Sequence, residues 1–301
     1  MTTIELLGVQ MDLGQSRRGV EMGPSAVRHA QLEARLESLG HVVRDAGDIA
    51  VPTRETIDAT RGLDYLDTIT IVCRSLANST RDIVAKRHVP LVIGGDHSIA
   101  AGSIAGVAAA LAERGEKLGV LWIDAHGDLN TPESSDTGNV HGMPLAHLLG
   151  HGHQPLVQAG GPGASISAEH VAIIGARDLD EAERRHARDW GVRVYTMREI
   201  DERGMRAVMQ EAIARVTDGT GGIHVSLDLD FVDPREAPGV GTPVRGGATF
   251  REAHLAMETI ADTGKMVSMD LVEVNPVLDE FNQTAELAVG LVSSAFGKRI
   301  L

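Results

Sequence analysis

The stretch LGVLWIDAHGD, residues 118–128, decides the fold of this chain. Its first six residues are apolar or glycine, which is typical of a strand buried on both faces of a sheet. Asp124, His126 and Asp128 follow at every second position, so extended backbone would direct all three side chains to the same side. Because ligands bind beyond the carboxyl ends of parallel strands, the stretch predicts an α/β fold with a functional site at this strand end.

The same alternation of apolar runs and helical patterns continues along the whole sequence. Further strands are predicted at Ile4–Gln10, Val89–Ile93, Val171–Ile174, Val192–Tyr195, Ile223–Leu227 and Met266–Met269. Helices are predicted at residues 24–39, 66–86, 99–114, 181–190, 205–216, 250–263 and 284–296. Apolar strands that alternate with helices indicate a mostly parallel sheet covered on both sides. We therefore expect a single three-layer α/β domain over residues 1–301, with a long mobile loop at Gly150–Ser167.

The acidic composition narrows the classes of partner. The 301 residues contain 28 Lys and Arg against 42 Asp and Glu, which gives a formal net charge of −14. Binding to nucleic acid or to an anionic membrane needs clustered basic residues, so neither is expected. Cys73 is the only cysteine, which excludes an intrachain disulfide and a cysteine-based metal site. The N-terminal residues show no basic segment followed by an apolar run, so a cytoplasmic location is expected.

Two more predicted strands end in residues of the same kind. Gly94-Gly95-Asp96-His97 follows the strand at 89–93, and Asp228-Leu229-Asp230 follows the strand at 223–227. Any one such motif occurs often where a strand emerges into solvent, without further function. Together, the three strand ends would bring four carboxylates and two imidazoles to one edge of the sheet, at His97, Asp124, His126, Asp128, Asp228 and Asp230.

Four converging carboxylates would repel one another and would be costly to desolvate unless cations offset their charge. Two divalent ions would supply the four positive charges, and bridging carboxylates would let six side chains serve both ions. Oxygen ligands with a minority of imidazole suit Mn²⁺, while Zn²⁺, Fe²⁺ and Co²⁺ remain open. A pair of such ions lowers the pKa of water held between them, so the sequence predicts a metal-dependent hydrolase.

The three ligand motifs resemble those of the ureohydrolase family, in the same order along the chain. They are Gly94-Gly95-Asp96-His97-Ser98, Asp124-Ala125-His126-Gly127-Asp128 and Ser226-Leu227-Asp228-Leu229-Asp230. The resemblance extends to RGVEMGP at residues 18–24, GVGTP at 239–243 and DLVEVNP at 270–276, and so covers nearly the whole chain. It implies an eight-stranded parallel sheet, for which Val42–Asp45 is the candidate for the remaining strand.

Within that family the chain is most similar to arginases of the bacterial type, as judged from the loop at residues 130–142. The resemblance implies five residues that hold the amino-acid end of L-arginine: Asn130, Thr137 and Asn139 at the carboxylate, and Asp180 and Glu183 near the amino group. Two departures from the family pattern occur here. Thr137 stands where serine is common, and Glu181-Ala182 replaces the usual Pro-Gly before Glu183.

The resemblance also implies roles for the metal ligands and the catalytic groups. Asp124 and Asp228 would bridge two Mn²⁺ ions in each subunit, with His97 and Asp128 completing one shell and His126 and Asp230 the other. A hydroxide bridging the ions would attack the guanidinium carbon and yield L-ornithine and urea. Glu273 would bind the guanidinium, Asp128 would accept the proton, and His141 would shuttle protons beside the substrate. A homo-oligomer, a trimer or a hexamer, is implied as well.

The residues leave three other functions open. A sister ureohydrolase acting on agmatine or another guanidino compound would need no residues for an α-carboxylate. An unrelated two-metal hydrolase of amides or phosphates would have no need for a carboxylate that matches a guanidinium, as Glu273 does. A metal-binding regulatory module without turnover would release no urea when Mn²⁺ is added.

Overall fold

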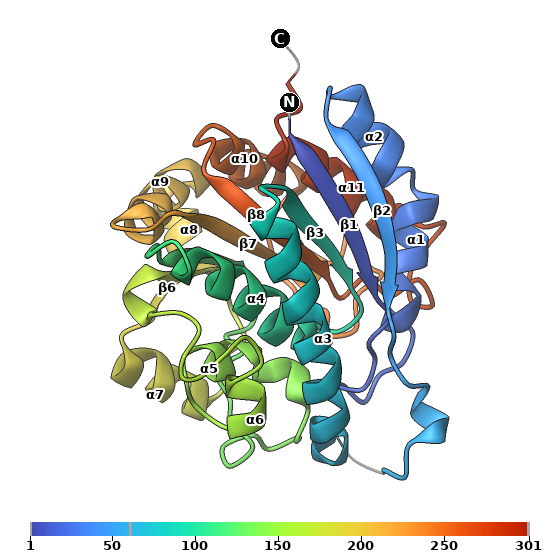
Figure 1. Ribbon diagram of the computed structural model, residues 1–301. Coiled ribbons are helices and arrows are strands. Elements are labelled where there is room, and N and C mark those ends of the chain that lie inside the picture. Colours follow the sequence, from blue (N-terminus) through green and yellow to red (C-terminus); the bar gives the residue numbers. More distant parts are fainter. Residues whose placement is uncertain (1, 60–61, 300–301) are drawn as a thin grey trace.

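The computed structural model describes residues 2–59 and 62–299 and is built around one eight-stranded parallel sheet (Figure 1). The strands lie in the order β2-β1-β3-β8-β7-β4-β5-β6. Their bounds are β1 Thr3–Val9, β2 Val42–Ile49, β3 Val89–Gly94, β4 Leu118–Ile123, β5 Val171–Ala176, β6 Arg193–Thr196, β7 Gly222–Asp228 and β8 Met266–Val272. The predicted α/β fold class is confirmed. Residues 1, 60–61 and 300–301 of the predicted domain lie outside the described residues.

Helices cover both faces of the sheet (Figure 1). One face carries α3 (Leu66–Ala85), α4 (Ala100–Ala112), α5 (Pro144–Leu148), α6 (Gln154–Val157) and α7 (Glu181–Trp190). The other carries α1 (Gly23–His29), α2 (Leu32–Ser38), α8 (Met197–Arg203), α9 (Met205–Thr217), α10 (Phe250–Ala261) and α11 (Gln283–Ala295). Alternate residues of β4 enter the two cores, Leu121 on the second face and Trp122 on the first. The apolar signal of β4 therefore comes from burial on both faces, as predicted.

The eighth strand is the candidate at Val42–Asp45, which the structure extends to Ile49 as the edge strand β2. Residues 44–48 of β2 are exposed, so the strand lacks the continuous apolar run of its neighbours. Arg28 of α1 binds this edge through Asp45 and Asp48, each with an N–O distance of 2.7 Å. Polar contacts along an exposed edge explain why its sequence signal is weak.

Two predictions about segments outside the sheet need correction. The helix predicted at residues 24–39 is two helices, because Gln31 between α1 and α2 has a φ of 68°, which ends a right-handed helix. The loop predicted at Gly150–Ser167 contains α6, which packs against α3. Two short helices that the sequence reading did not predict, α5 and α8, also lie between the strands.

The strand order places β3, β8, β7 and β4 side by side at the centre of the sheet. Their carboxyl ends therefore open onto the same edge, where the predicted ligands follow the strands. Within residues 2–59 and 62–299, no helix combines the length and the apolar character needed to span a bilayer.

Candidate metal centre

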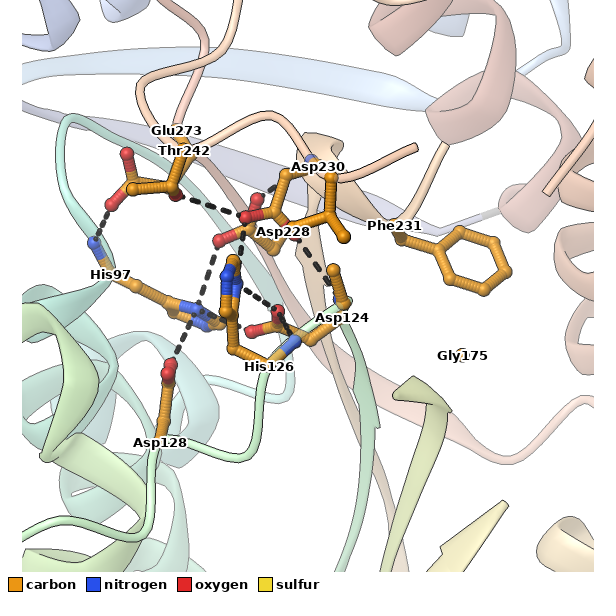
Figure 2. Close-up of polar contacts among 12 residues, drawn as sticks. His97, Asp124, His126, Asp128, Gly175, Asp228, Asp230, Phe231, Thr242 and Glu273 are labelled. Carbon is orange, nitrogen blue, oxygen red and sulfur yellow. Dashed lines mark hydrogen bonds and ion pairs between the residues drawn. The ribbon is translucent and has the colours of Figure 1, made fainter. Parts of the chain in front are cut away.

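The six predicted metal ligands converge beyond the carboxyl ends of β3, β4 and β7 (Figure 2). His97 opens the short 3-10 turn His97–Ile99, and Asp230 lies in a second such turn, Leu229–Phe231. The Asp228 carboxylate caps the second turn by accepting a hydrogen bond from the Asp230 backbone N–H at 2.8 Å. The Asp-x-Asp spacing therefore stabilises this turn, and the turn directs both carboxylates towards the site.

Packing behind this second turn is close. Phe231 is fully buried, and its ring lies against Gly175 at the end of β5 (Figure 2). A Cβ on Gly175 would lie 2.3 Å from that ring, and the φ of Gly175 is 98°. Only glycine meets both conditions, so the position of the Asp230 turn depends on this residue.

Five of the six ligands form two groups that share Asp124: His97, Asp124 and Asp228 form one, and Asp124, His126 and Asp230 form the other. Asp128 belongs to neither group and joins the site through its contact with His97. The Nδ1 atom of His97 lies 3.1 Å from Asp124 Oδ2, 3.0 Å from Asp128 Oδ2 and 3.3 Å from Asp228 Oδ2. In the second group, His126 Nδ1 lies 3.0 Å from Asp230 Oδ2 and 3.4 Å from Asp124 Oδ1 (Figure 2). Overlap at one carboxylate is the arrangement expected for two neighbouring cations.

Two atoms of the cluster have the character of cation ligands. His97 Nδ1 and Asp128 Oδ2 are buried, and within the described part of the chain neither has a hydrogen-bond partner of good geometry. Buried polar atoms are nearly always satisfied, so two unpaired ligand-type atoms among carboxylates fit residues that would bind a cation. Carboxylate oxygens with two ring nitrogens suit Mn²⁺ and other first-row divalent ions, so the residues fit a binuclear metal centre.

A second layer of contacts orients these ligands. The ring of His97 stacks on Trp122, with ring centroids 4.2 Å apart and an interplanar angle of 13°. Its Nε2 atom lies 2.8 Å from Ser226 Oγ, and Trp122 Nε1 donates to Asp124 Oδ2 at 3.0 Å. Thr242 Oγ1 donates to the Asp230 carboxylate at 3.2 Å. Such contacts fix the rotamer and tautomer of metal ligands.

Burial and mutual repulsion dominate the electrostatics of the cluster. Burial, together with the charge of Asp124, raises the pKa of Asp128 to about 6. Burial likewise raises the pKa of Asp228 well above its usual range. Burial alone would lower the pKa of His97, but its carboxylate neighbours outweigh that effect and raise it. Protons and cations therefore compete for the same atoms, and metal binding should strengthen as the pH rises.

Glu273 lies directly beside the ligands, just past the end of β8. It is fully buried, and its Oε1 atom accepts a hydrogen bond from the His97 backbone N–H at 2.9 Å. The same oxygen lies 3.0 Å from His141 Nδ1. Burial would lower the pKa of His141, but the charge and hydrogen bond of Glu273, together with the charges of Asp96 and Asp128, outweigh burial and raise this pKa to about 9. The structure thus brings two predicted catalytic residues into contact.

Two of the predicted catalytic residues have left-handed backbone. The φ of Asp128 is 52° and that of Glu273 is 66°. Non-glycine residues rarely adopt this conformation, and they persist there when surrounding contacts hold them. Both side chains are directed at the metal centre as a result of these turns (Figure 2).

The residues predicted for the amino-acid end of the substrate fall into two groups. Asn130 Nδ2 donates to Asp180 Oδ2 at 2.7 Å, and Asp180 and Glu183 form a reciprocal capping box at the start of α7. Thr137 and Asn139 lie on the adjacent loop, where Thr137 Oγ1 accepts a hydrogen bond from the Asn139 backbone N–H at 3.2 Å. The capping box occupies the place where Glu181-Ala182 departs from the family pattern.

Several residues of the site were missed in the sequence. Trp122 and Ser226 each lie two positions before a ligand on the same strand, so the period of two could have identified them. Gln15 donates through Nε2 to Glu273 Oε2 at 2.8 Å across 258 positions of sequence. No local pattern marks such a contact.

Comparisons with known proteins agree with this geometry. A model of the arginase family matches residues 2–297. The chain is 51% identical to an arginase from Brevibacillus brevis over 298 residues, covering 99% of each chain. It is 50% identical to an arginase from Bacillus caldovelox over 303 residues, covering 100% of each. A crystal structure of the Bacillus caldovelox arginase matches with a TM-score of 0.95 at 49% identity, with 100% of both chains covered. The chain belongs to the arginase family.

Proposed function

We propose that this protein hydrolyses the guanidinium group of L-arginine to L-ornithine and urea and holds two Mn²⁺ ions in each subunit. The observation that carries the proposal is the pair of ligand groups that share Asp124 beside the buried carboxylate of Glu273. The arginases of the two bacilli, about half identical over the full chain, support arginine over agmatine as the substrate.

The proposed ligands are divided between two ions. Asp124 and Asp228 would be shared, His97 and Asp128 would complete one shell, and His126 and Asp230 the other. When bound, two divalent cations would lower the pKa of water towards neutrality and so supply a nucleophile at ordinary pH. The pairing of His97 with Asp128 at 3.0 Å, and of His126 with Asp230 at 3.0 Å, supports this division.

Glu273, Asp128 and His141 would handle the substrate and its protons. The Glu273 carboxylate offers two acceptor oxygens to the planar guanidinium. Asp128 has an unpaired Oδ2 and a pKa near 6, which suits a group that takes up and returns a proton. His141, with a pKa of about 9, is an imidazolium at neutral pH and can protonate the leaving amine. Its side chain is 14% exposed, so it can exchange that proton with solvent.

The amino-acid end of arginine would lie over the loop at residues 130–142 and the start of α7. Asn130, Thr137 and Asn139 would bind the carboxylate, and Asp180 and Glu183 would lie near the ammonium group. Asp180 is exposed and accepts a hydrogen bond from Asn130. This contact supports the proposal that the residues for the carboxylate and those for the ammonium group lie side by side. A homo-oligomer, a trimer or a hexamer, and a cytoplasmic location are parts of the same proposal.

Metal analysis combined with a urea assay tests the proposed function. The protein is loaded with Mn²⁺ and offered arginine, agmatine and guanidinobutyrate at equal concentrations. We expect two ions in each subunit and urea release from arginine far in excess of the other two. Faster urea release from agmatine would favour the sister activity. A metal-loaded protein that releases no urea from any of the three would contradict the proposal.

A further inference from the structure

The loop after β1, residues 10–18, covers one side of the candidate metal centre. The Gly14 backbone N–H donates to Asp96 Oδ2 at 2.7 Å, and the Gly14 carbonyl accepts from the His141 backbone N–H at 3.0 Å. Arg17 Nη1 donates to the Gly241 carbonyl at 2.8 Å. The loop is therefore tied to segments that follow three different strands, and its position relative to the site is well defined.

Gln15 is the residue of this loop that reaches the site. Its side chain is buried, with 1% of the residue exposed, and Nε2 donates to Glu273 Oε2 at 2.8 Å. A carboxylate can only accept, so the amide nitrogen must face Glu273 and the amide oxygen must face away from it. That oxygen, Oε1, is buried and has no hydrogen-bond partner among residues 2–59 and 62–299.

The unpaired oxygen packs closely against Gly241. A Cβ on Gly241 would lie 2.6 Å from Gln15 Oε1 and 3.3 Å from Glu273 Oε2. The two oxygens therefore both lie next to Gly241. Buried acceptors without a donor are uncommon, and a guanidinium carries only donors. The unpaired Gln15 Oε1 atom beside Glu273 could therefore accept a hydrogen bond from a bound guanidinium.

We propose that Gln15 positions the Glu273 carboxylate for guanidinium binding and offers its own Oε1 atom to the same cation. This inference rests on the proposed function, because it adds a residue to the guanidinium subsite. Gln15 restrains one oxygen of Glu273, while the His97 backbone N–H and His141 restrain the other. With both oxygens held, the carboxylate cannot rotate away from the metal ligands.

The backbone of Gln15 is itself fixed. Arg54 Nη1 donates to the Gln15 carbonyl at 3.1 Å and to the Asp12 carbonyl at 3.3 Å. The Arg54 guanidinium lies over the ring of Tyr65, 4.9 Å from its centroid. These contacts hold the loop without using the Gln15 side chain, so a change to that side chain should leave the loop in place.

Gln15→Met tests the proposal, because methionine keeps the length of the side chain and removes both polar atoms. Calorimetry on the Mn²⁺-loaded protein measures the Kd of guanidinium ion and, separately, of ornithine. A hydrogen bond to a charged group corresponds to a change of about 10- to 100-fold. We expect guanidinium to bind about 10- to 100-fold more weakly, with ornithine binding, metal content and Tm close to those of the wild type. Gln10→Met, at an exposed residue of the same loop, is the matched control and should change neither Kd.

Three outcomes are decisive. An unchanged guanidinium Kd in Gln15→Met overturns the inference, and so does an equal loss of guanidinium and ornithine binding, which indicates a general structural role. If Gln15→Met does not fold, Gln15→Glu replaces it, since it keeps the shape and can donate to Glu273 only while protonated. Guanidinium binding by Gln15→Glu should then change between about pH 6 and pH 9 in a way that the wild type does not, and the same pH profile in both proteins overturns the inference. Calorimetry needs no turnover, so a wild type that releases no urea sinks the proposed function separately.

Discussion

Replacing Trp122 by phenylalanine would remove one hydrogen-bond donor from the candidate metal centre and keep an aromatic ring there. Trp122 is fully buried, and its Nε1 atom donates to Asp124 Oδ2 at 3.0 Å. Its ring stacks on His97 with centroids 4.2 Å apart. Phenylalanine can stack on His97 but cannot donate, so Asp124 loses the contact that orients the carboxylate common to both ligand groups.

The magnitude follows from the kind of bond that is lost. A hydrogen bond to a charged acceptor contributes about 1.5–3 kcal/mol, and about 1.4 kcal/mol corresponds to a tenfold change in a binding constant. Mn²⁺ binding by Trp122→Phe should therefore weaken by about 10- to 100-fold, the range typical for contacts behind a metal ligand. The smaller ring also leaves unfilled volume, so the metal-free protein should lose about 1–2 kcal/mol of unfolding free energy.

Titration of the metal-free protein with Mn²⁺ in a calorimeter measures the effect, and the chain offers a matched control. Trp190, the other tryptophan, stacks on His151 and His186 with centroids 3.8 Å and 4.3 Å apart. Trp190 and the two histidines it stacks on belong to neither ligand group, so Trp190→Phe should bind Mn²⁺ as the wild type does. Trp190→Phe also leaves Trp122 as the only tryptophan of the sequence, and bound Mn²⁺ should quench the fluorescence of Trp122. Equal Mn²⁺ affinities in the two variants would refute the reasoning.

Three further perturbations probe the site and its pH dependence. Asp228→Ala should abolish most turnover and release metal, as measured by metal analysis beside the urea assay; a near-normal rate with a full metal complement would contradict the ligand assignment. His141→Ala should stay folded and metal-loaded with kcat lower by about 10²- to 10⁴-fold, and an unchanged kcat would remove His141 from the mechanism. Burial raises the pKa of Glu183 from 4.5 to about 7, so ionisation opposes folding and stability falls as the pH rises from about 4.5 through 7. Metal-free Glu183→Gln should match the wild type near pH 4.5 and exceed its unfolding free energy by about 3 kcal/mol at pH 8. Urea denaturation at both pH values measures this difference. A variant less stable than the wild type at pH 8 would show that ionisation of Glu183 does not destabilise the folded protein.

The central strands and the convergence of the ligands could be predicted because their signals are local. β4 is apolar at every position since both of its faces are buried, and that pattern is visible in the sequence. Asp124, His126 and Asp128 alternate along one segment, and parallel strands must present their carboxyl ends at one edge. The exposed edge strand β2 had a weaker signal, because only part of it enters the core.

The break at Gln31 had no comparable signal. Its left-handed φ of 68° separates α1 from α2, although the residues on both sides are good helix formers. The packing of these two helices against the sheet and α11 overrides that local preference. Local propensity therefore predicted a helix in this region but not its division.

The sequence by itself determined the kind of sheet and identified the candidate metal ligands, because both depend on local patterns: a period of two, or strands that alternate with helices within a few tens of residues. Only the tertiary structure decided how the ligands are oriented and which residues restrain Glu273. The Gln15–Glu273 contact joins residues 258 positions apart. Such a contact arises from the packing of separate strands, and the pattern of residues near either position does not specify it.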